Sequence, residues 1–452
     1  MKFSVQDLVQ LQLATGMSNN KMKQLATTIR QQVGRNSIQS NFQAELALFG
    51  VEIKQEYVVS DVMIGKEGVQ VAHCQDFNIL VGKVLDLRGL NPHETMIKLS
   101  IDGGQNFLKM IASFINLERN TDVDPSEFVK SNLTSDRFRD SGVLKAVPVA
   151  VAQVSETPES LEKILDLVQV DSVMFKIAAD LKVGALLLGL QSAASCHPCI
   201  WCNVHKDHYF SAGETELRTF GSIREQAALY RQGGNKNAKF YFNCVRDPLL
   251  KEENDALVLD IVPPMELHIF MGVTSRLFNF LVDEMESLAM SWIKELHLEK
   301  SVYHGSTSFN GRSCRVLVQN YARLEALAPN DGSRFRLQRF IQVFRSLDTV
   351  VDSCFGTVLR EGYATDIEIF EQAYIDLGYP ASPKVHALIT HIPQFISRSG
   401  KSLGLFSEQS CETFHSLFQN TWKSRFARKL GHPDYSQKLL ECVQEVAAKH
   451  SF

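Results

Sequence analysis

The residues with the clearest chemical potential are the cysteines of the segment CHPCIWC at 196–202. Cys199 and Cys202 are separated by two residues, and two thiolates at this spacing can supply half of the tetrahedral shell that zinc prefers. Redox chemistry by the same pair is the weaker interpretation, because no thioredoxin-like strand and helix surround it. The segment therefore predicts half of a zinc site.

The missing zinc ligands are expected to be histidine or cysteine. His386 and His391 are separated by four residues and form a distant pair, which would tie the second half of the chain to the first. Cys196, His205 and His208 lie beside the two thiols and offer a compact local site instead. Both arrangements remain open from spacing alone.

Acidic residues at strand ends suggest a second kind of metal chemistry. Asp102 follows the alternating run 96–101 and precedes a Gly-Gly turn, and Asp180 follows the run 173–177. Two carboxylates at strand ends, joined by a third from a later helix, can hold two Mg²⁺ ions about 3.5 to 4 Å apart for in-line phosphoryl displacement. A common Asp-Gly turn explains Asp102 equally well when it is taken alone.

The third carboxylate is expected in the segment SEQSCETFH at 407–415. Glu408, Glu412 and His415 are predicted to share one helical face, because they fall at positions i, i+4 and i+7. The opposite stripe, expected to be buried, consists of Phe414, Leu417, Phe418 and Trp422. A solvated acidic helix face is the simpler interpretation of the two glutamates.

The elements that must position these residues follow from hydrophobic periodicity. Alternating runs predict strands at 57–59, 69–71, 96–101, 107–115, 143–154 and 173–177. Residues 1–45 have helical spacing, an amphipathic helix follows Pro158, and the chain from about 210 onward is mostly helical. Strands in sequence, then a helix and a further strand, indicate an α/β core.

Composition and charge limit the class of protein. The 452 residues are 44% hydrophobic and 22% charged, which is typical of a globular protein rather than a disordered or disulfide-dense one. No run of 18 apolar residues occurs and the first residues do not resemble a signal peptide, so we expect no membrane span and a cytosolic or nuclear location. The net charge of −4 argues against a protein that binds nucleic acid over its whole surface.

The charge is nevertheless unevenly distributed. The first forty residues carry five basic and one acidic side chain, a local charge of +4, and a helix-turn-helix or a packed helical pair would both explain them. A basic run without acidic residues follows Glu412 and is interleaved with Trp422 and Phe426; it comprises Lys423, Arg425, Arg428 and Lys429. DNA contact at these two places is expected to be local, since each is also explained as a solvated helix face.

Taken together, the motifs resemble a known family. The resemblance rests on Asp180 followed after eighteen residues by Cys199-x2-Cys202, on His386-x4-His391-Ile392-Pro393, and on Ser407-Glu408-x3-Glu412. These segments are similar to the catalytic core of the Transib transposases and of the catalytic subunit of the vertebrate V(D)J recombinase, which belongs to the same lineage. The similarity extends, colinearly, over residues 97–450.

The resemblance implies roles for individual residues. Asp102, Asp180 and Glu412 correspond to the family's catalytic carboxylates, and Glu408 is kept as the alternate because the vertebrate spacing differs by one residue. Cys199, Cys202, His386 and His391 correspond to its split structural zinc site. Further matches are the Leu-His pair that ends at His268 and the Asn-Gly segment that begins at Asn310, whose following Arg315 would face DNA.

The fold that the resemblance implies is α/β and helix-rich overall. It has an RNase H-like core sheet, a large and mostly α-helical insertion, and a small helical N-terminal segment. The expected boundaries are 1–48 for that segment, 49–95 for a short β-containing segment before the core, 96–209 for the first part of the core, 210–380 for the insertion, and 381–452 for the C-terminal helices.

The activity that the resemblance implies is cleavage and strand transfer on DNA by a two-metal mechanism. Mg²⁺ or Mn²⁺ would serve as the two catalytic ions, and Zn²⁺ would be structural. The expected partners are DNA, a second copy of the chain and an accessory subunit, in the nucleus. The long N-terminal modules of the recombinase subunit have no counterpart visible here, so a domesticated, non-catalytic DNA- or protein-binding derivative is the alternative.

Overall fold

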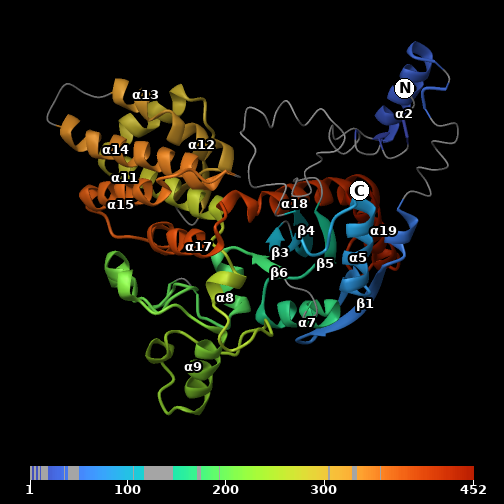
Figure 1. Ribbon diagram of the computed structural model, residues 1–452, viewed down its shortest axis with the longest axis horizontal. Helices are drawn as coiled ribbons and strands as arrows, with labels where there is room; N and C mark the ends of the chain where they lie inside the picture. The colour runs from blue at the N-terminus through green and yellow to red at the C-terminus, as the bar shows by residue number, and fades with distance from the viewer. Residues whose placement is uncertain are drawn as a thin grey trace. The chain divides into compact units, whose positions relative to one another are not determined.

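Figure 1 shows a computed structural model of the chain. The structure describes residues 3–4, 7–8, 11, 19–34, 36–38, 50–104, 106–116, 146–170, 175–192, 194–303, 306–327, 333–356 and 358–451. Two compact units make up the chain. The first, called the sheet unit here, comprises Met1–Glu118, Asp136–Ile177 and Gln409–Phe452; the second, called the helical unit, comprises Arg119–Ser135 and Ala178–Glu408.

The sheet unit is built on a six-stranded sheet with the order β1-β2-β5-β4-β3-β6. The strands are β1 (Tyr57–Ile64), β2 (Glu67–Cys74), β3 (Thr95–Gly104), β4 (Phe107–Asn116), β5 (Val147–Ala152) and β6 (Phe175–Ala178). The pairs β1–β2, β2–β5, β5–β4 and β4–β3 are antiparallel. Since the sheet is mixed, β6 runs parallel to its neighbour β3.

The hairpin of β3 and β4 carries Asp102. Their register pairs Asp102 with Lys109 and ends at Gly104 opposite Phe107, so the Gly-Gly sequence forms the end of the strand. The central residues of both strands and all of β5 are buried, which explains their nearly continuous apolar runs. Asp102 therefore stands near the carboxyl end of a strand that is paired on both sides.

The described part of the sheet unit contains several helices. They are α2 (Asn19–Gln32), α4 (Val51–Lys54), α5 (Phe77–Arg88), α7 (Pro158–Val168), α18 (Gln409–Thr421), η9 (Trp422–Phe426) and α19 (Tyr435–His450). Asp76 caps α5 through the backbone N–H of Ile79 at 3.0 Å, and Gly89 ends it with a φ of 61°. A reciprocal Thr157 and Ser160 capping box starts α7. Helices α7 and α19 both pack on β1, β2 and β5.

The helical unit is centred on the long helix α11, which is drawn in yellow and olive in Figure 1. Its helices are α8 (Leu181–Leu187), η4 (Lys206–Glu214), α9 (Phe220–Gln232), η5 (Ala238–Tyr241), α10 (Val258–Ile261), α11 (Glu266–Glu295), α12 (Gly311–Gln319), α13 (Tyr321–Ala326), α14 (Arg334–Val350), η6 (Val351–Phe355), α15 (Tyr363–Leu377), α16 (Pro383–His386), η7 (Ala387–His391), α17 (Ile392–Ser399) and η8 (Leu403–Leu405). Helix α11 buries a stripe that includes Ile269, Val273, Leu277 and Leu281, and it packs against α12 and α14. A short hairpin, β7 (Ser301–Tyr303) with β8 (Ser306–Ser308), follows it.

The helix-rich α/β class predicted from the sequence is confirmed. The predicted strands are all present, and the strands expected at 57–59 and 69–71 belong to the same sheet as the others. The first residues of two predicted strands, 143–145 and 173–174, and much of the N-terminal segment lie outside the described residues. Within the described part of the chain, no helix is both long and apolar enough to cross a membrane.

Candidate functional site

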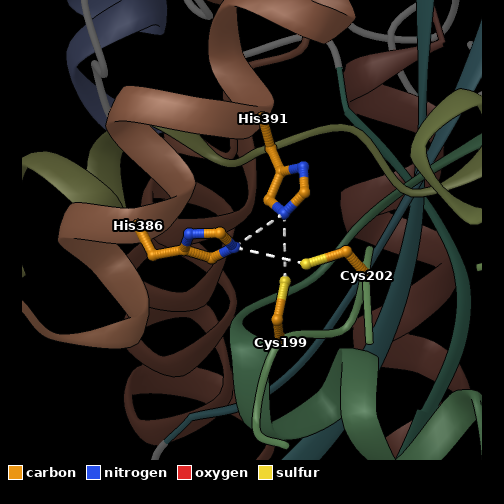
Figure 2. A group of neighbouring side chains, drawn as sticks. All are labelled: Cys199, Cys202, His386 and His391. Carbon is orange, nitrogen blue, oxygen red and sulfur yellow. Dashed lines mark hydrogen bonds between the residues drawn. The ribbon is translucent and has the colours of Figure 1, made fainter. Parts of the chain in front are cut away.

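Four buried side chains of the helical unit converge on one point, as Figure 2 shows. The Cys199 sulfur lies 3.1 Å from Nε2 of His391, and the Cys202 sulfur lies 3.3 Å from Nε2 of His386. The two Nε2 atoms are 3.1 Å apart, and all four ligand atoms fall within 4.8 Å of one another. Two thiols and two imidazoles, each at most 3% exposed, form the donor set of a closed structural zinc site. The cluster can therefore hold a metal such as zinc.

The thiols sit on a loop whose carbonyls are held by a buried arginine. Nε of Arg218 donates to the carbonyl oxygens of Cys199 at 3.2 Å and Cys202 at 3.0 Å. The same guanidinium donates to the carbonyl of Phe242 at 2.9 Å, and the residue is 1% exposed. No spacing in the sequence indicates this role for Arg218, since the arginine lies sixteen residues beyond Cys202. Its side chain fixes the spacing of both sulfurs.

The histidines are brought together by a π turn. His386 ends α16 and His391 ends η7, the π-helical turn Ala387–His391. An α-helix aligns residues four apart, whereas a π turn bonds residue i to i+5 and so aligns residues five apart. The spacing His386-x4-His391 therefore requires the π turn in order to put both rings on one side.

The rings are oriented by hydrogen bonds at their other nitrogens. Nδ1 of His391 lies 2.8 Å from Oε1 of Gln394, and Nδ1 of His386 lies 3.3 Å from the hydroxyl of Thr390. Partners of this kind select the tautomer that leaves Nε2 available to a metal. Tyr209 also stacks on the His386 ring at 4.8 Å.

Proton positions in the cluster suit a metal. The hydrogen bond from Cys199, together with those from the histidines, lowers the pKa of Cys202, whereas burial raises the pKa of Cys199. For His391, burial lowers the pKa of the imidazole, because burial disfavours its charged form, and this favours the neutral ring. A metal bound by both sulfurs would displace the remaining thiol protons.

The local alternative for the zinc ligands is not supported. Cys196 is only half-buried and, with His205 and His208, is absent from the group of converging ligands found among the described residues. The ring of His205 instead contacts those of His197 and His208. Spacing left two ligand sets open, and the structure brings together the set in which His386 and His391 join Cys199 and Cys202.

The predicted catalytic carboxylates are divided between the units. Asp102 on β3 and Glu412 in the first turn of α18 belong to the sheet unit, and Asp180 belongs to the helical unit. Glu412 is exposed, and the Asp102 side chain is 27% exposed. Lys109 lies close enough to both carboxylates for their charges to act on it.

The Lys109 ammonium is a cation beside the sheet-unit carboxylates. Its ammonium donates to the carbonyls of Gly104 at 2.7 Å and Phe107 at 3.3 Å, and the residue is fully buried. Burial lowers the pKa of Lys109 to about 8, although Cys411, Asp102 and Glu412 act in the opposite direction. Spacing along the sequence gave no sign of this lysine, which pairs with Asp102 across the hairpin.

A second polar group lies in the helical unit. Asp180 caps α8 by accepting from the backbone N–H of Val183 at 2.7 Å. Glu408 accepts from the backbone N–H of His268 at 3.0 Å and also forms an ion pair with Nδ1 of its ring. Burial lowers the pKa of His268, but the charge and hydrogen bond of Glu408 outweigh it and raise the pKa to about 9.

The prediction that Glu408, Glu412 and His415 share one helical face is wrong. Helix α18 begins at Gln409, so Glu408 precedes it and is buried against His268 instead. His415 is buried at 4% exposure, whereas Glu412 points to solvent. The Glu408 carboxylate is thus held by His268, whereas the Glu412 side chain is exposed.

The residues expected to contact DNA differ in whether a neighbouring acidic side chain pairs with them. Arg315 on α12 and the side chains of Lys423, Arg428 and Lys429 are exposed, but Arg425 forms an ion pair with Glu445. Asn310 caps α12 through the backbone N–H of Ser313 at 2.8 Å, which gives it a structural role.

The aromatic residues of the basic run are buried. Trp422 packs edge-on against Phe107 and Tyr435, and Phe426 is only 8% exposed beneath Arg425. The interleaved pattern predicted from the sequence is therefore part of the core, where neither ring is placed to stack on a base.

Part of the chain matches a protein-family model whose function is unknown. Residues 127–231 match the model of a family described as a domain of unknown function, DUF8703. This segment includes β5, α7, β6 and the cysteine half of the metal cluster. A search of the curated proteins found no match.

Proposed function

We propose that the protein is a transposase- or recombinase-like enzyme that cleaves DNA and transfers strands by metal-dependent phosphoryl transfer on an RNase H-like core. The observation that carries the proposal is the order of the strands. β3, β4 and β5 follow one another in antiparallel pairs, and after α7 the chain returns to place β6 beside β3. Asp102 lies near the carboxyl end of β3, and Asp180 follows β6 after one residue.

This strand order supports the assignment of the carboxylates. The carboxyl ends of parallel neighbouring strands lie at the same edge of a sheet, which is where α/β folds place their ligands. Asp102, Asp180 and Glu412 would hold the two ions, and carboxylate oxygens are the ligands that Mg²⁺ and Mn²⁺ prefer. The partial exposure of Asp102 and the exposure of Glu412 leave both within reach of ions from solvent.

In the proposed mechanism, the metal ions would activate the nucleophile and the protein would position the reacting groups. Two bound ions would supply an activated water or 3′-hydroxyl and stabilise the leaving 3′-oxygen. The chain itself contributes position and charge: β3, which pairs with β4 along its length, carries Asp102, and the Lys109 ammonium lies near both sheet-unit carboxylates. In the helical unit, Glu408 keeps His268 protonated beside Asp180, whose charge also acts on that ring.

The Cys199, Cys202, His386 and His391 cluster is proposed to hold structural zinc. Four protein ligands at one point leave no open position for a substrate, so the ion would stabilise the helical unit without taking part in phosphoryl transfer. DNA would be the partner, bound in the nucleus by a homodimer or larger assembly, with an accessory subunit.

Cleavage of labelled duplex DNA in Mg²⁺ or Mn²⁺ tests the proposal. Asp102→Asn, Asp180→Asn and Glu412→Gln should each lower the rate at least about a hundredfold, the loss typical when a stabiliser of transition-state charge is removed. Asp166→Asn, an exposed carboxylate on α7, is the matched control and should cleave as the wild type does. Equal rates in wild type and the three variants, or no cleavage by wild type on any of several candidate ends, would overturn the proposal.

A further inference from the structure

A second group of potential metal ligands, with one thiol, one imidazole and one carboxylate, lies in the sheet unit. The Cys411 sulfur is 3.4 Å from Nε2 of His415, and Nδ1 of His415 is 3.3 Å from Oδ2 of Asp102. One ligand atom from each of the three residues falls within 4.8 Å of the other two.

The local fold brings these three side chains together. Cys411 and His415 are four residues apart on α18 and therefore lie on one helix face, while Asp102 comes from β3. Gly104 makes the approach of the imidazole possible, because a Cβ at that position would stand 2.1 Å from Nδ1 of His415. The glycine at the end of β3 is thus explained by the histidine that lies against it.

A nucleophilic role for this trio is excluded by burial. The order thiol, imidazole and carboxylate matches that of a cysteine nucleophile with its base and orienting acid. Cys411 and His415 are, however, only 3% and 4% exposed, so a substrate has no access to the sulfur. A single ion is far smaller, and the partly exposed Asp102 carboxylate gives it a point of entry.

The charges of the group also suit a divalent ion. Besides Asp102, the charged groups near this cluster include the Glu412 carboxylate and the Lys109 ammonium. They also include the Glu156 carboxylate, which accepts from the backbone N–H of Gly103 at 2.6 Å. With Cys411 as thiolate, these groups carry four negative charges and one positive charge, and a dication would offset most of the excess negative charge.

We propose that Asp102, Cys411 and His415 form a second metal site, which takes Zn²⁺ or Co²⁺ in preference to Mg²⁺. Sulfur and imidazole donors select transition metals over hard cations, and three protein ligands leave one coordination position open. This site is inferred from its three ligand side chains and does not depend on the proposed cleavage activity. It shares Asp102 with that activity, so an ion bound here would compete with the catalytic ions.

Titration of the zinc-loaded full chain with Co²⁺, without DNA or Mg²⁺, tests the site. We expect one cobalt per chain in addition to a retained zinc, measured by atomic absorption after gel filtration. A thiolate-to-cobalt charge-transfer band should accompany it. Cys411→Ala and His415→Gln should lose both the cobalt and the band, and the nearly isosteric Asp102→Asn should weaken binding even if the other two variants fold poorly.

The matched control is Cys442→Ala, which removes an equally buried thiol on α19 and should bind cobalt as the wild type does. Wild type that takes up no cobalt while keeping its zinc would overturn the proposal. A charge-transfer band that persists in Cys411→Ala would overturn it as well. Since none of these readouts involves DNA, their failure is distinguishable from failure of the cleavage assay.

Discussion

Glu408 and His268 form a buried ion pair that joins the start of α11 to the residue immediately before α18. The carboxylate is 5% exposed and accepts from both the backbone and the ring of the same histidine. Its two hydrogen bonds account for the burial of the glutamate, because an unpaired buried carboxylate would be very costly. The pair therefore fixes the first turn of α11 against Glu408. Glu412, in contrast, is exposed to solvent.

The Glu408 and His268 pair should stabilise the protein in a pH-dependent way. The pKa of His268 is raised to about 9 in the folded chain and is about 6.5 when unfolded, so the contribution is complete below pH ~6.5 and is lost as pH rises through ~9. A double-mutant cycle of His268→Gln and Glu408→Gln, measured by urea unfolding, should give a coupling of about 3 kcal/mol at pH 6. At pH 10 the coupling should be much smaller.

The exposed pair of Arg398 and Asp260 provides the control for that cycle. Its side chains are 45% and 36% exposed, so its coupling should stay below about 1 kcal/mol. A His268 and Glu408 coupling that is equal at pH 6 and pH 10 would contradict the assigned protonation of the histidine.

Removal of zinc should unfold the helical unit selectively. The cluster links the loop of Cys199 to the turn of His391, and the free energy of binding structural zinc is folding free energy. Hydrogen exchange followed by mass spectrometry should show that chelation, or Cys202→Ser, removes protection from α11 and α17. Protection of β1 and β2 in the sheet unit serves as the internal reference. Unchanged exchange in α11 would argue against a structural metal.

The amide of Gln394 should strengthen metal binding without touching the ion. Its Oε1 accepts from Nδ1 of His391 and holds Nε2 toward the sulfurs. Loss of such a partner weakens metal affinity by about 10- to 100-fold, so Gln394→Ala should release zinc to a competing chelator at correspondingly lower chelator concentration. Gln372→Ala on α15, whose side-chain amide donates to Asp376 away from the cluster's ligands, should behave as wild type. Equal zinc retention by both variants would remove Gln394 from the site.

Alanine substitutions at Gly104 and Gly82 should change the stability of the folded chain in opposite directions. Gly104→Ala places a methyl group against His415 and should destabilise the chain by about 1 to 3 kcal/mol, the usual cost of overpacking. Gly82→Ala in the middle of α5 meets nothing within 4 Å and should stabilise it by about 0.5 to 1 kcal/mol. Thermal melting checks both signs, and a neutral Gly104→Ala would mean that His415 moves away freely.

Much of the fold and the Cys and His cluster could be predicted because their signals are local or compositional. Alternating apolar residues predicted the strands, and the scarcity of Cys and His made their spacing informative. Helix α5 is not among the elements predicted, although Asp76 and Gly89 mark its two ends and Phe77, Leu80 and Val84 have helical spacing. That signal was present in the sequence.

Other features depend on tertiary contacts and have no counterpart in spacing. The start of α18 could not be predicted, because it depends on Glu408 meeting a histidine 140 residues earlier. The role of Arg218 depends on carbonyl groups, which no sequence pattern displays. Burial of Trp422 likewise follows from packing on Phe107 across the sheet unit and not from the basic residues beside it.

The great separation of the metal ligands along the chain has a consequence for biosynthesis. Cys202 precedes His386 by 184 residues, and Cys199 precedes His391 by 192. At a translation rate of about 5 to 20 residues per second, the thiols leave the ribosome on the order of 10 to 40 s before the imidazoles. During that interval a nascent chain has two of its four ligands, so metal loading is expected to be a late step that follows release of most of the helical unit.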